Sequence, residues 1–200
     1  MGFDLHGMAP KINEPEPAIL KQHHWGSVPE DAKEDYWSAS DNYEKANPGI
    51  YFRNNVWWWR PLWTYICGLC DDILTEKDME KGGHNGGQVI SKTKAQKIAT
   101  RILMENKSGE LDKYAQQYKE TIANLPKETC TICDGVGMRT PPLLNEHFEI
   151  NKDAQDTLEK CNGCEGTGKR RAWAASYPFS VENAVEFANF AKESGGFQIC

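Results

Sequence analysis

Two segments of the chain repeat one pattern of cysteines and glycines: residues 130–137 read CTICDGVG and residues 161–168 read CNGCEGTG. Two thiolates three residues apart can reach one metal ion from a tight turn. The glycines that follow allow positive φ angles and turn amide groups toward the sulfurs. Two such turns supply four sulfurs, which form the closed tetrahedron of a structural zinc site. We therefore predict one structural Zn²⁺ ion in a module of about residues 127–173, held by Cys130, Cys133, Cys161 and Cys164.

Two other interpretations of the repeat stay open. The cysteines could be free thiols in two glycine turns, or redox-active pairs, although no βαβ pattern surrounds either pair. A third pair, Cys67 and Cys70, lies in an apolar stretch with helical spacing and lacks the following glycines. This favours buried cysteines that act as small hydrophobic side chains. The sequence does not decide whether Cys67, Cys70 and Cys200 bind a second metal.

The repeated C-x-x-C-x-G-x-G pattern resembles the cysteine-rich region of DnaJ-type cochaperones. That family typically carries four such repeats and two zinc ions, whereas this chain has two repeats. The His-Pro-Asp tripeptide of a J-domain does not occur either. The resemblance covers residues 130–168, implies metal binding, and does not extend to a chaperone function.

The composition indicates a folded chain of one domain, or one domain with a small appended module. Of its 200 residues, 39% are hydrophobic, which is enough for a core. The net charge of −6 disfavours nucleic-acid binding, and the dense basic run is limited to residues 169–171. No apolar run is long enough to span a bilayer, no signal-peptide pattern occurs, and C-x-x-C pairs suit a reducing compartment. We expect a cytoplasmic protein without a membrane partner.

Hydrophobic periodicity predicts a mainly helical α+β fold, with a small zinc-knuckle module packed on a helical domain. A capping pattern at Ser27 predicts a helix over about residues 29–46, and Pro61 is expected to open a helix that continues to Ile73. Further helices are expected over about residues 92–105, 110–124 and 181–193, with a loop over residues 76–90. We divide the chain into a polar N-terminal arm with a helix (1–49), a helical aromatic-rich core (50–126), the zinc module (127–173), and a C-terminal helix and tail (174–200).

A stretch rich in tryptophan and arginine is the strongest indication of function. Four tryptophans stand within residues 57–63, and three in a row on a helix or strand face different directions. Tryptophan and arginine are enriched in binding hot spots, and with asparagine they suit a protein or a nucleotide-like ligand. The alternative is purely structural, with large aromatic side chains building the core. The predicted contact residues are Arg53, Asn54, Asn55, Trp57, Trp58, Trp59 and Arg60.

The segment YFRNNVWWWRPL (51–62), the opening MGFD and the ending SGGFQIC (194–200) resemble an uncharacterised family of small proteins encoded by bacteriophages and bacteria. The resemblance covers most of the chain from residue 50 onward, while residues 10–48 look like an extension. A phage setting would imply an accessory or counter-defence factor in the host cytoplasm. No family function is carried over to particular residues.

The usual enzyme signatures for phosphate binding, dinucleotide binding, metalloproteases and serine hydrolases are absent from the sequence. One pattern resembles that of zinc deaminases: His147 and Glu149 precede Cys161 and Cys164. The proline expected before the first cysteine is missing, because Lys160 stands there, and the spacing is too short. The deaminase pattern also leaves the first cysteine pair without a role.

We therefore expect a non-catalytic, zinc-containing binding protein whose partner is a protein or a nucleotide-like ligand. A single-stranded nucleic-acid-binding zinc protein is one alternative, with Lys169, Arg170 and Arg171 on phosphates. A deaminase-like enzyme is the other. The sequence does not give the oligomeric state.

Overall fold

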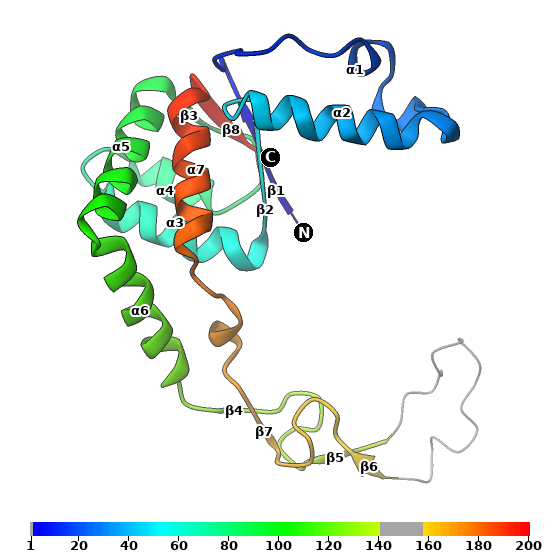
Figure 1. Cartoon of the computed structure of the whole chain (residues 1–200). Coiled ribbons are helices and arrows are strands. Elements are labelled where there is room, and N and C mark those ends of the chain that lie inside the picture. Colours follow the sequence, from blue (N-terminus) through cyan, green and yellow to red (C-terminus); the bar gives the residue numbers. More distant parts are fainter. Residues whose placement is uncertain (1, 141–157) are drawn as a thin grey trace. The chain divides into compact units, whose positions relative to one another are not determined.

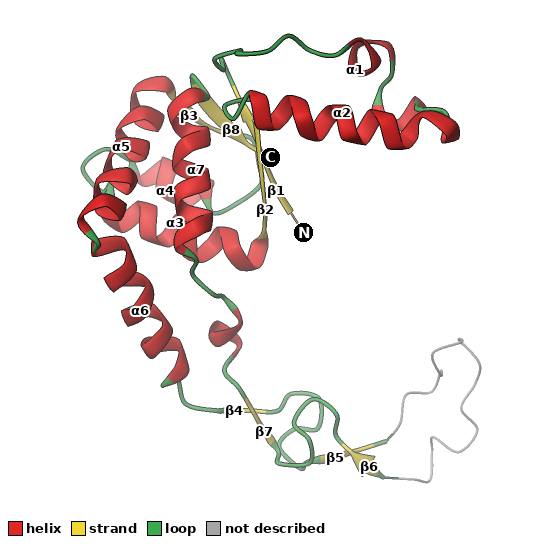
Figure 2. Cartoon of the chain, viewed as in Figure 1, coloured by secondary structure: helices red, strands yellow, loops and turns green. Residues whose placement is uncertain are grey.

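The computed structural model describes residues 2–140 and 158–200, which form two compact units. The first unit comprises Met1–Tyr118 and Tyr177–Cys200, and the second comprises Lys119–Ser176. Helices predominate and the strands are few and short (Figures 1 and 2). The expected α+β, mainly helical fold class is confirmed.

The first unit is built on a four-stranded antiparallel sheet in the order β2-β1-β8-β3. Strand β1 spans Gly2–Gly7, β2 spans Tyr51–Asn55, β3 spans Gln88–Ser91 and β8 spans Gly196–Ile199. The first and last strands of the chain therefore lie side by side in the middle of the sheet (Figure 1). Residues 2–7, which the sequence analysis assigned to a polar arm, form a central strand instead.

Helices cover one face of this sheet. The larger ones are α3 (Val56–Leu69), α5 (Lys92–Ser108) and α7 (Val181–Glu193), while α6 (Glu110–Ala123) follows α5 in the chain. The short helix α4 (Glu76–Gly82) precedes β3. Before β2 come α1 (Ala18–Gln22), the 3-10 turns η1 (Trp25–Ser27) and η2 (Glu30–Ala32), and α2 (Lys33–Ala46).

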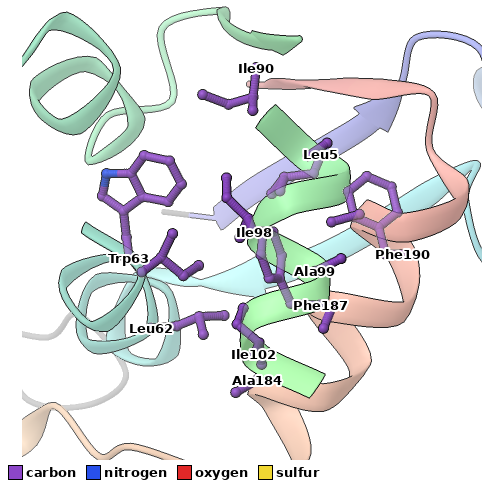
Figure 3. Close-up of a cluster of buried hydrophobic side chains, with 14 of the residues drawn as sticks. Leu5, Leu62, Trp63, Ile90, Ile98, Ala99, Ile102, Ala184, Phe187 and Phe190 are labelled. Atoms are coloured by element: carbon purple, nitrogen blue, oxygen red, sulfur yellow. The ribbon is translucent and has the colours of Figure 1, made fainter. Parts of the chain in front are cut away.

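The core of the first unit lies between the sheet and helices α3, α5 and α7 (Figure 3). Leu5 and Ile90 reach it from the strands, and both are fully buried. Helices α5 and α7 pack against each other through small and branched side chains. Because apolar residues recur at helical spacing in α5 and α7, both helices were predictable from sequence. The labelled members of the core are Leu5, Leu62, Trp63, Ile90, Ile98, Ala99, Ile102, Ala184, Phe187 and Phe190.

The prediction that Pro61 opens a helix is wrong, because α3 begins at Val56 and contains the proline. The side-chain oxygen of Asn55 accepts hydrogen bonds from the Trp57 and Trp58 amides, at 3.0 and 3.1 Å. An asparagine in this position satisfies amide groups that have no partner inside the helix. The cap therefore starts the helix at Val56, five residues before the proline, which lacks an N–H of its own.

Residues 76–90 are not the expected loop, since they contain α4 and β3. Thr75 and Asp78 form a reciprocal capping box at the start of α4. The helix expected over residues 29–46 is also shorter, because η2 precedes α2 and Ser27 does not cap it. No helix within residues 2–140 and 158–200 is both long and apolar enough to cross a lipid bilayer.

The second unit contains two short antiparallel ribbons and a 3-10 turn. Strand β4 (Glu128–Thr129) pairs with β7 (Lys169–Arg170), and β5 (Met138–Arg139) pairs with β6 (Glu159–Lys160). The turn η3 spans Trp173–Ser176. Each cysteine pair lies between these strands, so the ribbons bring the two pairs together.

Candidate metal centre

The structure brings the four predicted cysteines into one buried cluster in the second unit. All their Sγ atoms lie within 4.8 Å of one another. The sulfurs of Cys130 and Cys161 are 3.8 Å apart, and those of Cys133 and Cys164 are 3.6 Å apart. A tetrahedron with Zn–S bonds of about 2.3 Å has edges of about 3.8 Å. The spacing of the four sulfurs therefore fits a tetrahedral metal ion.

The backbone around each cysteine pair has the conformation that the glycines were expected to allow. Gly135 and Gly137 both have φ of 83°, and Gly166 and Gly168 have 82° and 69°. The Gly137 amide donates to the Cys133 sulfur at 3.2 Å, and the Gly168 amide donates to the Cys164 sulfur at 3.3 Å. Such hydrogen bonds stabilise negative charge on a metal-bound thiolate.

The two cysteine turns also pair with each other through the backbone. The Cys130 amide donates to the Gly168 carbonyl, and the Cys161 amide donates to the Gly137 carbonyl, both at 2.9 Å. The repeat in the sequence thus becomes a pair of equivalent turns facing one cluster. A Cβ atom at Gly137 would lie 2.3 Å from the Gly166 carbonyl oxygen. The close approach of the turns therefore requires glycine.

The electrostatics of the cluster favour a bound cation. Burial raises the pKa of the Cys130 thiol, but hydrogen bonds from the Ile132 and Cys133 amides outweigh burial and lower this pKa to about 7. Burial raises the pKa of Cys133 to about 11. Four thiols this close cannot all ionise without a compensating positive charge. A divalent cation would supply that charge, and binding it would release protons.

The predicted binding segment of the first unit is divided by the fold. Arg53 is exposed and lies 3.7 Å from the Asp4 carboxylate. Asn54 is buried and donates to the side-chain oxygen of Asn183 at 2.9 Å. Asn55 is the cap of α3, so its side-chain oxygen is already engaged. Of these three residues, Arg53 keeps a side chain open to a partner.

The tryptophans that follow point in different directions. Trp59 is fully buried, stacks on Phe3 and Trp63, and donates from its indole nitrogen to the Gly82 carbonyl at 2.9 Å. We therefore remove Trp59 from the set of candidate contact residues, because its ring forms part of the core. Trp57 and Trp58 are half-buried.

The exposed end of this segment forms a small cluster with Tyr177. The Trp57 ring lies 4.9 Å from the Tyr177 ring. The Arg60 guanidinium donates to the Tyr177 hydroxyl at 3.0 Å and lies 5.8 Å from the centre of that ring. The sequence could not place Tyr177 here, because more than a hundred residues separate it from Arg60. We call Trp57, Arg60 and Tyr177, together with Trp58 as the next residue after Trp57, the aromatic–arginine cluster.

The remaining cysteines are not part of a described metal cluster. Cys70 is buried and Cys67 is half-buried, and burial raises the pKa of each thiol to about 11. Cys200 is exposed. Within residues 2–140 and 158–200, no second group of three or more metal-ligating side chains is found. His147 and Glu149 of the deaminase pattern lie outside the described residues.

No protein-family model matches the chain, and no curated protein or solved structure matches it.

Proposed function

We propose that this chain is a non-catalytic zinc-binding protein whose second unit is organised around one structural Zn²⁺ ion. The buried cluster of four sulfurs carries the proposal, because their spacing suits a tetrahedron. Cys130, Cys133, Cys161 and Cys164 would fill all four zinc positions and leave none for water or substrate. The ion would therefore stabilise the unit rather than carry out a reaction.

The metal content and ligands of the purified chain test this proposal. Native mass spectrometry with elemental analysis should give one zinc per chain. A cobalt-substituted sample should show the absorption of four thiolate ligands. The Cys133→Ser variant should lose metal, whereas Cys67→Ser and Cys200→Ser should keep it. Iron in place of zinc, or fewer than four sulfur ligands, would contradict the assignment.

A role in binding rests on the aromatic–arginine cluster of the first unit. The Arg60 cation over the Tyr177 ring, with the Trp57 indole beside that ring, suits planar ligands and aromatic side chains. Arg60, Trp57 and Trp58 would contact a protein or nucleotide-like partner, and Arg53 would contribute from the exposed end of β2. Asn54, Asn55 and Trp59 serve the fold of the first unit instead.

Nucleotide titrations monitored by tryptophan fluorescence test the binding role. AMP and GMP should quench the fluorescence in a saturable way, and Arg60→Ala and Trp58→Ala should each weaken binding about tenfold, by removing one hot-spot contact. The Arg171→Ala variant is the matched control, since its side chain is exposed in the second unit. Unchanged binding in both cluster variants would contradict this assignment for nucleotides.

The same variants distinguish the nucleic-acid alternative. If a single-stranded DNA oligomer binds with a steep salt dependence, and Arg171→Ala weakens it more than Arg60→Ala, then Lys169–Arg171 would be the contact surface. The net charge of −6 argues against this outcome.

A further inference from the structure

The backbone of β2 presents hydrogen-bonding groups at a free edge of the sheet. Asp4 exchanges hydrogen bonds with Cys200, at 2.9 and 2.8 Å, so its backbone groups face β8. The backbone N–H and C=O groups of successive residues in a strand point to opposite neighbouring strands, so those of Phe3 and Leu5 point to β2. They pair with Asn54 and Phe52. The N–H and C=O groups of the intervening residues, Tyr51 and Arg53, therefore face away from the sheet.

This edge has no partner strand within the described residues. Strand β2 is the last in the order β2-β1-β8-β3, and within residues 2–140 and 158–200 no backbone–backbone hydrogen bond is found for the outward groups of Tyr51 and Arg53. Proteins usually cover, charge or shorten such edges, because an open edge can pair with another chain. The edge of β2 is thus able to accept an extended segment.

A groove with an aromatic floor runs beside this edge. Its volume is about 500 Å³, and α2, β2 and α7 line it. Phe52 and Phe190 stack with their ring centres 5.8 Å apart and form part of the lining, together with Tyr51. An extended segment paired with β2 directs alternate side chains to each face of the sheet. Those on the Phe52 side would enter the groove.

The charge around the groove is negative. Three carboxylates line it, those of Asp41, Glu44 and Glu186, against one ammonium, that of Lys45. None of the three carboxylates belongs to an ion pair found among the described residues. Partial burial raises the pKa of Glu44, and the nearby Asp41 raises it further. A cation in the groove would relieve this repulsion.

We propose that the groove beside β2 binds an extended, basic segment of a partner protein, which adds to the sheet as a further strand. Backbone pairing with Tyr51 and Arg53 would hold the segment. Its lysine or arginine side chains would meet Asp41, Glu44 and Glu186, and apolar side chains would rest on Phe52. The site uses neither the four cysteines nor the aromatic–arginine cluster, and it involves the backbone of Arg53 rather than the side chain assigned to the binding role above. It therefore goes beyond the function proposed above and can fail independently of it.

Synthetic peptides test this directly on the full zinc-loaded chain. The probe is a panel of fluorescein-labelled peptides of about eight residues, in which the alternate positions that share one face carry both basic side chains (lysine or arginine) and apolar ones (valine, isoleucine or phenylalanine). The control panel carries glutamate in place of the basic residues. Basic peptides should raise the fluorescence anisotropy in a saturable way and slow hydrogen exchange at the amides of Tyr51 and Arg53. Binding of neither panel, or of both equally, would overturn the proposal.

Arg53 offers a matched pair of variants. Arg53→Pro removes the outward N–H, and proline is tolerated on edge strands where that group bonds nothing in the sheet. Arg53→Ala loses the same side chain and keeps the N–H. Peptide affinity should fall about tenfold or more in the proline variant, and stay near wild type in the alanine variant. Equal affinities would contradict strand addition.

Two further measurements keep the proposal open to disproof if the proline variant does not fold. The double variant Glu44→Gln, Glu186→Gln should weaken peptide binding, while Glu34→Gln with Glu80→Gln, both away from the groove lining, should not. Sedimentation of the free chain tests whether a second copy of the chain, rather than a partner protein, covers the edge of β2. One outcome is that the chain sediments as a dimer in which the Tyr51 amide is protected from hydrogen exchange, and that the Glu44→Gln, Glu186→Gln variant forms the same dimer. This result would show that a second copy covers the edge, and it would overturn the proposal.

Discussion

Gly137 and Gly168 hold the two cysteine turns together through the space that a side chain would need. Each has a positive φ, and a Cβ on either would lie within 2.3 Å of a carbonyl oxygen of the other turn. Their amides also donate to two of the four sulfurs. A single methyl group here therefore affects the backbone, the packing and the charge of the cluster together.

We expect Gly137→Ala to weaken metal binding at least tenfold, because the turns must move apart and the amide–sulfur hydrogen bond lengthens. Competition with a chromogenic chelator measures this. The control is Gly109→Ala, whose φ of 81° is similar but whose Cβ meets nothing within 4 Å. It isolates backbone strain, which costs about 1–3 kcal/mol, and should leave metal affinity unchanged. Equal metal affinity in both variants would show that the contact between turns is unimportant.

The cap of α3 gives a second prediction for one residue. Asn55→Ala should lower the free energy of unfolding of the first unit by about 1 kcal/mol, because two amides lose their acceptor. Asn55→Asp keeps an acceptor in the same place and should restore most of the stability. Urea titrations of both variants make the comparison. If alanine and aspartate behave alike, the cap contributes nothing measurable.

At the scale of elements, α4 depends on one buried carboxylate. Asp78 is 5% exposed, completes the capping box with Thr75, and accepts hydrogen bonds from Lys94 and Gln88. The Lys94 ammonium also forms an ion pair with it. A helix of seven residues with few buried side chains relies on such contacts at its start.

The same carboxylate makes the stability depend on pH. Burial raises the pKa of Asp78, but hydrogen bonds from Lys94 and Thr75 outweigh burial and hold this pKa below its ordinary value of 3.8. Its contribution is therefore complete above about pH 4 and is lost as the pH falls through the lower pKa of the folded chain. Asp78→Asn should lower the free energy of unfolding by about 1–3 kcal/mol at neutral pH. It should also make this free energy depend less on pH below about pH 4. Asp71→Asn, at an exposed position, should change neither the free energy of unfolding at neutral pH nor its dependence on pH.

Helices and strands differed in how far the sequence alone could predict them. Helix α7 spans Val181–Glu193, as predicted, because its apolar face and its Ser180 cap are both local signals. Strand β1 was missed because its partners, residues 51–55 and 197–199, are remote in the sequence. The four cysteines were found because their spacing is local. The sequence did not predict which tryptophans lie in the core and which near the surface, because their positions depend on contacts with Phe3, Gly82 and Tyr177, which are remote in the sequence.

At the scale of the whole molecule, the two units use different sources of stability. The first buries a continuous apolar core, whereas the buried hydrophobic cluster found in the described part of the second consists of its four cysteines. Zinc removal should therefore unfold the second unit and leave the first folded. Hydrogen exchange should show loss of protection at Gly137 and Gly168 and no change in α5 and α7. Loss of protection in α7 would contradict this separation.

The central position of β8 has a consequence for biosynthesis. Strand β3 pairs with β8 and not with β1, so β3 has no partner strand while the earlier segments leave the ribosome. The cysteine turns, at residues 130–168, are translated before β8 and can take up metal first. The sheet of the first unit can close only after residues 196–199 have emerged, so it cannot form while the preceding residues are still being synthesised. Deletion of β8 would separate β3 from β1 and leave an open edge on each of these two strands.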